Sequence, residues 1–77
     1  MIKVLFFAEL EEIVGSREII IDQSQMSVNE VKEYLKAKFP TLAVDRAMVA
    51  VNEEYAEDAD LVKKDDVVAF IPPVSGG

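Results

Sequence analysis

The sequence predicts an α+β domain in which a mixed sheet packs against one main helix. Continuous apolar runs at residues 2–8 and 67–71, near the two ends of the chain, are typical of strands inside a sheet. Residues 28–38 instead carry apolar side chains at helical spacing. With 77 residues, the chain is expected to form one domain spanning residues 1–77.

The first strand is expected to open a wide hairpin. Residues 2–8 are apolar on both faces apart from Lys3, which predicts a strand that is covered on both sides. Residues 9–14 can form a short helical turn that Gly15 ends. Residues 17–22 include three consecutive isoleucines and predict a second strand that pairs with the first.

A capping box predicts where the main helix begins. The Ser27 side chain can accept a hydrogen bond from the amide of Glu30, whose own side chain can reach back to the amide of Ser27. Met26 and Val31 fit a hydrophobic staple, and Pro40 closes the helix. The predicted apolar stripe is Val28, Val31, Leu35 and Phe39, and the polar face carries Asn29, Lys32, Glu33 and Lys36.

The second half of the chain predicts three further strands. Residues 47–51 form the third strand, and a tight turn leads into a short fourth strand around Tyr55. Residues 63–66 form a turn before the last strand, 67–71. A Pro-Pro pair ends that strand, because proline lacks the amide that a sheet ladder needs.

These elements together predict the β-grasp, or ubiquitin-like, arrangement. The first and last strands lie side by side and parallel at the centre of the sheet, and the helix packs across one face. The predicted core combines the helix stripe with the inward side chains of the two central strands, namely Val28, Val31, Leu35 and Phe39 with Val4, Phe6, Val68 and Phe70.

One face of this sheet is predicted to keep apolar side chains that the helix does not cover. Strand alternation turns Leu5 and Phe7 away from the helix, and likewise Val67, Ala69 and Ile71. An exposed apolar patch on a small domain commonly marks a partner site. The alternative is that loop residues fold over the patch, the candidates being Leu42, Val44 and Leu61.

The composition excludes several classes of function. The chain has no cysteine and no histidine, which removes a thiol nucleophile and the usual ligands of zinc and iron–sulfur sites. A net charge of −7 disfavours nucleic acid and favours a partner with a basic groove. The lysines of the helix and of the turn at 63–66 alternate with acidic residues and are expected on the solvated surface.

The expected location is cytoplasmic. No apolar stretch approaches the roughly 18 residues that span a bilayer. The apolar residues at the start of the chain are too few for a secretory signal.

The chain ends in an uncharged segment, residues 72–77, which is expected to be an extended, flexible C-terminal tail. Glycine lacks a Cβ, so Gly76 and Gly77 can thread a narrow slot in another protein. This pattern favours the α-carboxylate of Gly77 as the reactive group. The alternative is an ordinary frayed terminus with no chemical role.

The sequence resembles the small-subunit family of molybdopterin synthase over nearly its whole length. The opening Ile2-Lys3-Val4-Leu5-Phe6-Phe7-Ala8, the central Ala50-Val51-Asn52 and the run Asp65-Asp66-Val67-Val68-Ala69-Phe70 are similar to that family. The specific part is the ending, Pro72-Pro73-Val74-Ser75-Gly76-Gly77. Gly-Gly alone also fits ubiquitin-like modifiers and the thiamine-pathway sulfur carrier.

The resemblance implies a mechanism in which the chain binds no cofactor and ATP is used by an adenylating, E1-like enzyme. Adenylated Gly77 is converted to a thiocarboxylate, which enters the large subunit of the synthase and gives its sulfur to cyclic pyranopterin monophosphate. The catalytic pocket is expected on that large subunit, in a heterotetramer with a dimeric large subunit at its centre. The implied site residues are Gly77 and Gly76 for the chemistry, and Phe7, Tyr55, Ile71, Pro72, Pro73, Val74 and Ser75 for partner binding.

Other readings remain open at this point. A related carrier for thiamine synthesis or tRNA thiolation has the same ending, as does a protein modifier that forms isopeptide bonds. An interaction domain with an inert tail is a third class. For Tyr55, β propensity alone equally predicts a partly buried residue at the edge of the sheet.

Overall fold

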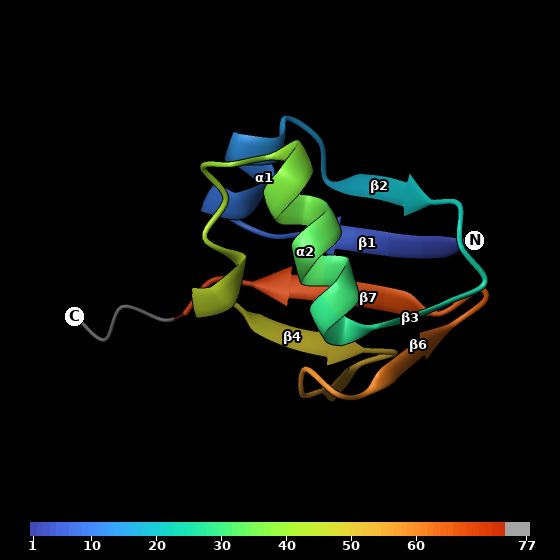
Figure 1. The fold of residues 1–77 in the computed structure, drawn as a ribbon. Helices are drawn as coiled ribbons and strands as arrows, with labels where there is room; N and C mark the ends of the chain where they lie inside the picture. The colour runs from blue at the N-terminus through green and yellow to red at the C-terminus, as the bar shows by residue number, and fades with distance from the viewer. Residues whose placement is uncertain (74–77) are drawn as a thin grey trace.

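The central feature of the fold is the parallel pair formed by β1 (Ile2–Phe6) and β7 (Val67–Ile71) (Figure 1). The computed structural model describes residues 1–73, so the predictions for Val74, Ser75, Gly76 and Gly77 lie outside the described residues. The pair belongs to a five-stranded sheet of order β2-β1-β7-β4-β5, whose other strands are β2 (Glu18–Ile21), β4 (Met48–Val51) and β5 (Glu54–Tyr55). This mixed sheet confirms the predicted β-grasp topology.

Pairing in register places aromatic side chains next to each other in the core. Val4 lies opposite Val68, and Phe6 lies opposite Phe70. The two phenylalanine rings stack with centroids 6.1 Å apart. All four side chains are fully buried, as the alternation predicted.

The first strand is shorter than predicted, and only one of its faces is covered. β1 ends at Phe6, because Ala8 turns the backbone with a φ of 52° before α1 (Glu9–Val14) begins. Gly15 ends α1 in the left-handed region, with a φ of 85°. Side chains of β1 that point away from the core stay partly or largely exposed, so the prediction of a strand covered on both sides was wrong.

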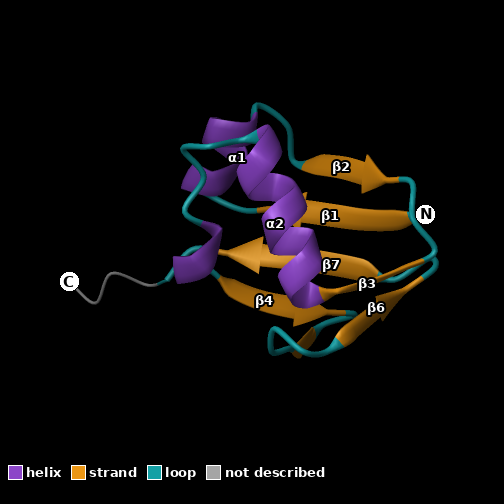
Figure 2. Cartoon of the chain, in the orientation of Figure 1, coloured by secondary structure: helices purple, strands orange, loops and turns teal. Residues whose placement is uncertain are grey.

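The main helix α2 (Val28–Lys38) begins and ends where the sequence predicts, and it crosses one face of the sheet (Figure 2). The capping box is complete: the amide of Glu30 donates to Ser27 Oγ at 3.1 Å, and the amide of Ser27 donates to Glu30 Oε1 at 2.8 Å. Val28, Val31 and Leu35 are fully buried. Phe39, at the C-cap, is only partly buried and packs at the margin of the core.

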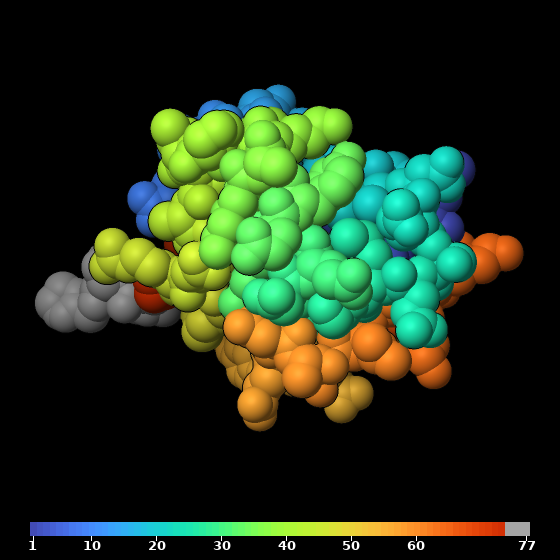
Figure 3. Space-filling model, in the orientation of Figure 1, coloured from blue at the N-terminus to red at the C-terminus, as the bar shows by residue number. Residues whose placement is uncertain are grey.

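Three short elements were not predicted. β3 (Gln25–Ser27) and β6 (Leu61–Lys63) pair in a small second sheet, and the 3₁₀ helix η1 (Val44–Arg46) buries Val44. Each spans three residues, which is too short for a hydrophobic period to be visible in the sequence. In the space-filling view, the segment that leads into β6 (orange) packs beside α2 (green) (Figure 3).

The prediction that the helix lysines lie on the solvated surface is wrong for Lys32. Only 8% of Lys32 is exposed, and its Nζ lies 2.7 Å from Oδ1 of Asp58. The carbonyls of Asp58 and Asp60 also accept hydrogen bonds from the amides of the first turn of α2, at 3.0 and 2.9 Å. The ion pair therefore belongs to a contact that holds the loop before β6 against the helix.

In residues 1–73, no helix has the length and apolar character needed to cross a membrane.

We expect Asp58→Asn to lower the free energy of unfolding by about 1–2 kcal/mol, because the Lys32 ammonium would stay buried without its counter-charge. Asp45→Asn is the matched control. It removes a pair of the same 2.7 Å length, between Lys36 and Asp45, in which both side chains are exposed to water. That control should leave stability nearly unchanged. Urea unfolding curves measure both variants, and equal losses would contradict the assignment.

Candidate functional site

The face of the sheet opposite α2 carries the apolar side chains that the sequence predicted to be uncovered. Leu5, Val67, Ala69 and Ile71 alternate with the buried side chains of β1 and β7 and are only partly buried. Loop residues do not cover them: Leu42 and Val44 lie in the main core, and Leu61 is 52% exposed. The prediction of an open apolar face is therefore confirmed for the described residues.

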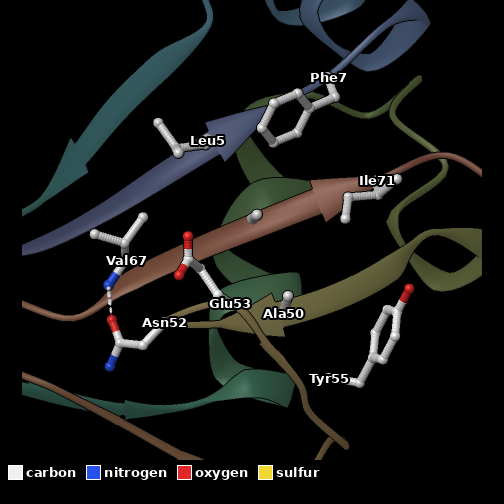
Figure 4. A pocket seen from close by; sticks show the side chains of 9 residues that line it. Leu5, Phe7, Ala50, Asn52, Glu53, Tyr55, Val67 and Ile71 are labelled. Carbon is white, nitrogen blue, oxygen red and sulfur yellow. Dashed lines mark hydrogen bonds between the residues drawn. The ribbon is translucent and has the colours of Figure 1, made fainter.

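This face contains a shallow pocket of about 650 Å³. We call the surface formed by the residues that line this pocket the docking face. Figure 4 shows side chains gathered around it from β1 and the residue after it, from β7 and β4, and from the β4–β5 turn and β5. The lining residues are Leu5, Phe7, Ala50, Asn52, Glu53, Tyr55, Val67, Ala69 and Ile71.

Of the seven residues predicted to contact a partner, the structure brings Phe7, Tyr55 and Ile71 together around this pocket. The amide of Phe7 donates to the carbonyl of Phe70 at 3.3 Å, which places Phe7 beside Ile71 at the end of β7. Phe7 is 40% exposed and Tyr55 is 77% exposed. The alternative of a partly buried Tyr55 is wrong, because β5 lies at the free edge of the sheet and nothing in residues 1–73 packs over the ring.

The chain enters its tail directly beside the docking face. Pro72 is partly buried and Pro73 is exposed, and neither lies in a helix or strand. Their predicted contact with a partner remains a prediction. The chemical role of Gly76 and Gly77 also remains a prediction, since these residues lie outside the described part of the chain.

The turn between β4 and β5 is held against β7 by a polar clasp that was not predicted. The Asn52 amide donates to the Val67 carbonyl at 2.8 Å, and the Val67 amide donates to Asn52 Oδ1 at 3.0 Å. Asn52 Nδ2 donates to Asp66 Oδ1 at 3.0 Å. Asn52 and Glu53 have φ values of 51° and 73°, as a type I′ hairpin turn requires. An asparagine in a tight turn is the sequence signal that could have suggested such a clasp.

Asp66 completes the clasp through its second oxygen. The amide of Lys63 donates to Asp66 Oδ2 at 2.8 Å. The hydrogen bond from Asn52, followed by that from the Lys63 amide, holds the pKa of the Asp66 carboxyl below its usual value. The ionised carboxylate therefore stabilises the turn in front of β7.

The described part of the site presents a mostly apolar surface, with Glu53 as its charged residue. The whole chain lacks cysteine and histidine, and residues 1–73 contain no cluster of side chains that could hold a metal ion.

Comparison with known proteins gives consistent similarities. The model of the ThiS family matches residues 4–77. The molybdopterin synthase sulfur carrier subunit of Arabidopsis thaliana is 39% identical, over 99% of this chain and 82% of that protein. The subunit of the same name from Haemophilus influenzae is 35% identical over the full length of both chains.

Solved structures share the fold. SAMP1 from Haloferax volcanii, a small archaeal modifier protein, superposes with a TM-score of 0.83 at 29% identity, over 99% of this chain and 98% of that one. A chain from the complex of subunits 1 and 2 of molybdopterin-converting factor from Helicobacter pylori superposes with a TM-score of 0.73 at 20% identity. The match covers 99% of this chain and 97% of that one. At that identity the likeness shows the fold alone.

We expect Asp66→Asn to lower the melting temperature at pH 7 and to have less effect under acid conditions. A lowered pKa in the folded state means that the carboxylate contributes stability above its usual pKa near 3.8 and loses it as the pH falls further. Parallel melts of wild type and variant from about pH 7 down to about pH 2.5, a range that includes the usual pKa of an aspartate, measure the difference. Asp22→Asn, at an exposed site after β2, is the control. A difference that stays constant down to the lowest pH would contradict the role of the ionised Asp66.

Proposed function

The chain belongs to the ThiS family, and we propose that it acts as the sulfur carrier subunit of a molybdopterin synthase. The observation that carries the proposal is the open docking face, which lies where β7 leads into the Gly-Gly tail. The full-length similarity to sulfur carrier subunits supports it. The expected partners are the large subunit of the synthase and an ATP-dependent adenylating enzyme, in the cytoplasm.

The proposed chemistry takes place at the carboxylate of Gly77. A free carboxylate has a poor leaving group, so its oxygen first attacks the α-phosphate of ATP on the activating enzyme and pyrophosphate departs. Hydrosulfide from a sulfur donor then attacks the carbonyl carbon and displaces AMP, which leaves a thiocarboxylate on Gly77. The absence of cysteine and histidine supports assigning the catalytic groups to the partners.

The thiocarboxylate is then proposed to enter the large subunit. There its sulfur passes to cyclic pyranopterin monophosphate, and water restores the Gly77 carboxylate. Two such deliveries build the dithiolene. Residues 74–77 can extend at most about 13–14 Å, so the docking face must seat close to the mouth of the partner's pocket.

Docking on the large subunit is proposed to use Phe7, Tyr55 and Ile71 as apolar anchors. Burial of large, exposed apolar side chains at the centre of an interface supplies most of its binding energy. Pro72 and Pro73 restrict the backbone between the anchors and the tail, which lowers the entropy lost when the tail is ordered. The assembly is proposed to be a heterotetramer around a dimeric large subunit.

A second candidate function is modification of other proteins. The similarity to the small archaeal modifier protein SAMP1, at 29% identity, favours this candidate. The same adenylate would then react with a lysine amine instead of a sulfur nucleophile. Isopeptide-linked adducts on cell proteins that carry the Gly77 carboxyl would support it.

We expect Ile71→Ala and Phe7→Ala each to weaken binding of the large subunit by about 2 kcal/mol or more, as truncation of a central apolar anchor typically does. The control is Ile13→Ala, which removes an exposed apolar side chain on α1 outside the docking face. Titration calorimetry measures all three variants. Wild-type affinity for both docking-face variants would exclude this mode of docking.

Removal of Gly77 should abolish sulfur transfer and leave thermal stability nearly unchanged, because an exposed terminus adds little to the core. The shortened chain would place its carboxylate about 3.3–3.6 Å from the required position. Gly76→Ala should slow transfer, since a Cβ narrows the fit in a slot. Synthase activity and a melting curve are measured for each chain. Retained activity without Gly77 would contradict the proposed function.

A further inference from the structure

Glu53 is the only charged residue that lines the described docking face. Its side chain crosses over β7 with the carboxylate above the strand, among the apolar side chains of the pocket (Figure 4). Within residues 1–73 it forms neither an ion pair nor a side-chain hydrogen bond, which is also true of several other surface carboxylates. What distinguishes Glu53 from them is its position among the apolar side chains of the docking face.

The backbone holds Glu53 in position at some cost. Its φ of 73° lies in the left-handed region, where glycine or asparagine is favoured and most other residues are strained. The preceding residue, Asn52, is fixed to β7 and Asp66 by the hydrogen bonds of the clasp. The carboxylate is thus presented over the docking face from a rigid turn.

A partner that covers this face also buries the negative charge of Glu53. Burial of the apolar lining also removes water from Glu53, which is unfavourable unless a cation replaces the water. The chain has a net charge of −7, so a basic partner surface would also be attracted from a distance.

We propose that the Glu53 carboxylate forms an ion pair with a lysine or arginine side chain of the large subunit when that subunit docks on the apolar face. This inference rests on the proposed function, because it takes the large subunit as the occupant of the face. The apolar anchors supply most of the affinity, and the Glu53 ion pair selects the basic partner and sets the register of docking.

The test is titration of the purified large subunit from the same organism with Glu53→Gln, which keeps the shape of the side chain and removes its charge. Binding should weaken about 10-fold or more at low salt, and its dependence on salt should decrease. Glu53→Lys should weaken binding further. Glu54→Gln is the matched control, because Glu54 is the adjacent exposed carboxylate and does not line the face; its affinity should stay within about 2-fold of wild type.

The outcomes separate this inference from the proposed function. If Ile71→Ala weakens binding and Glu53→Gln does not, the ion pair is wrong and the docking face stands. If neither variant weakens binding, the docking of the large subunit on this face is wrong as well. If Glu53→Gln leaves the affinity unchanged but makes the chain self-associate in sedimentation experiments, Glu53 serves to keep copies of the chain apart, and the inference is overturned. An unchanged melting temperature confirms that the clasp is intact in each variant.

Discussion

The fold is governed by one constraint: only one helix of the described residues, α2 with 11 residues, is long enough to cover the five-stranded sheet. α2 can bury one face only, so the apolar side chains on the other face of β1 and β7 stay in contact with water. Since β7 is also the last strand, the chain leaves the sheet beside that open face. The same packing limit therefore leaves an exposed apolar surface and places Pro72, the residue after β7, next to it.

The parts of the fold that depend on periodicity could be predicted from the sequence. Apolar spacing and the Ser27–Glu30 capping box predicted both ends of α2, and alternation predicted which side chains of β1 and β7 face the helix. Features that depend on a distant contact could not be predicted. Lys32 lies in a polar stripe of the helix, and its burial depends on Asp58, 26 residues further along the chain. Tyr55 has a high strand propensity, but propensity does not tell whether an edge residue is covered.

The apolar part of the candidate site could likewise be predicted from the sequence, and its polar part could not. Strand parity was enough to place Phe7 and Ile71 together on the open face, and both lie there. The polar half of the site was missed, because the contribution of Asn52 depends on hydrogen bonds to Asp66 and Val67, 14 and 15 residues away. These bonds connect the turn that carries Glu53 to the strand that carries Ile71. In the proposed docking, the partner would therefore meet a face whose backbone is already held in place, and little ordering of that backbone would be needed on binding.

In the proposed function, this small chain contributes a carboxylate and a surface, while its partners supply the catalytic groups. Intact-mass measurement after incubation with ATP, the adenylating enzyme and a sulfur donor can decide whether Gly77 carries the sulfur. We expect the mass increase of one oxygen replaced by sulfur, assigned by fragmentation to Gly77 and absent when ATP is left out. An unchanged mass while the adenylating enzyme consumes ATP in the presence of the chain, or sulfur attached at any other residue, would contradict it.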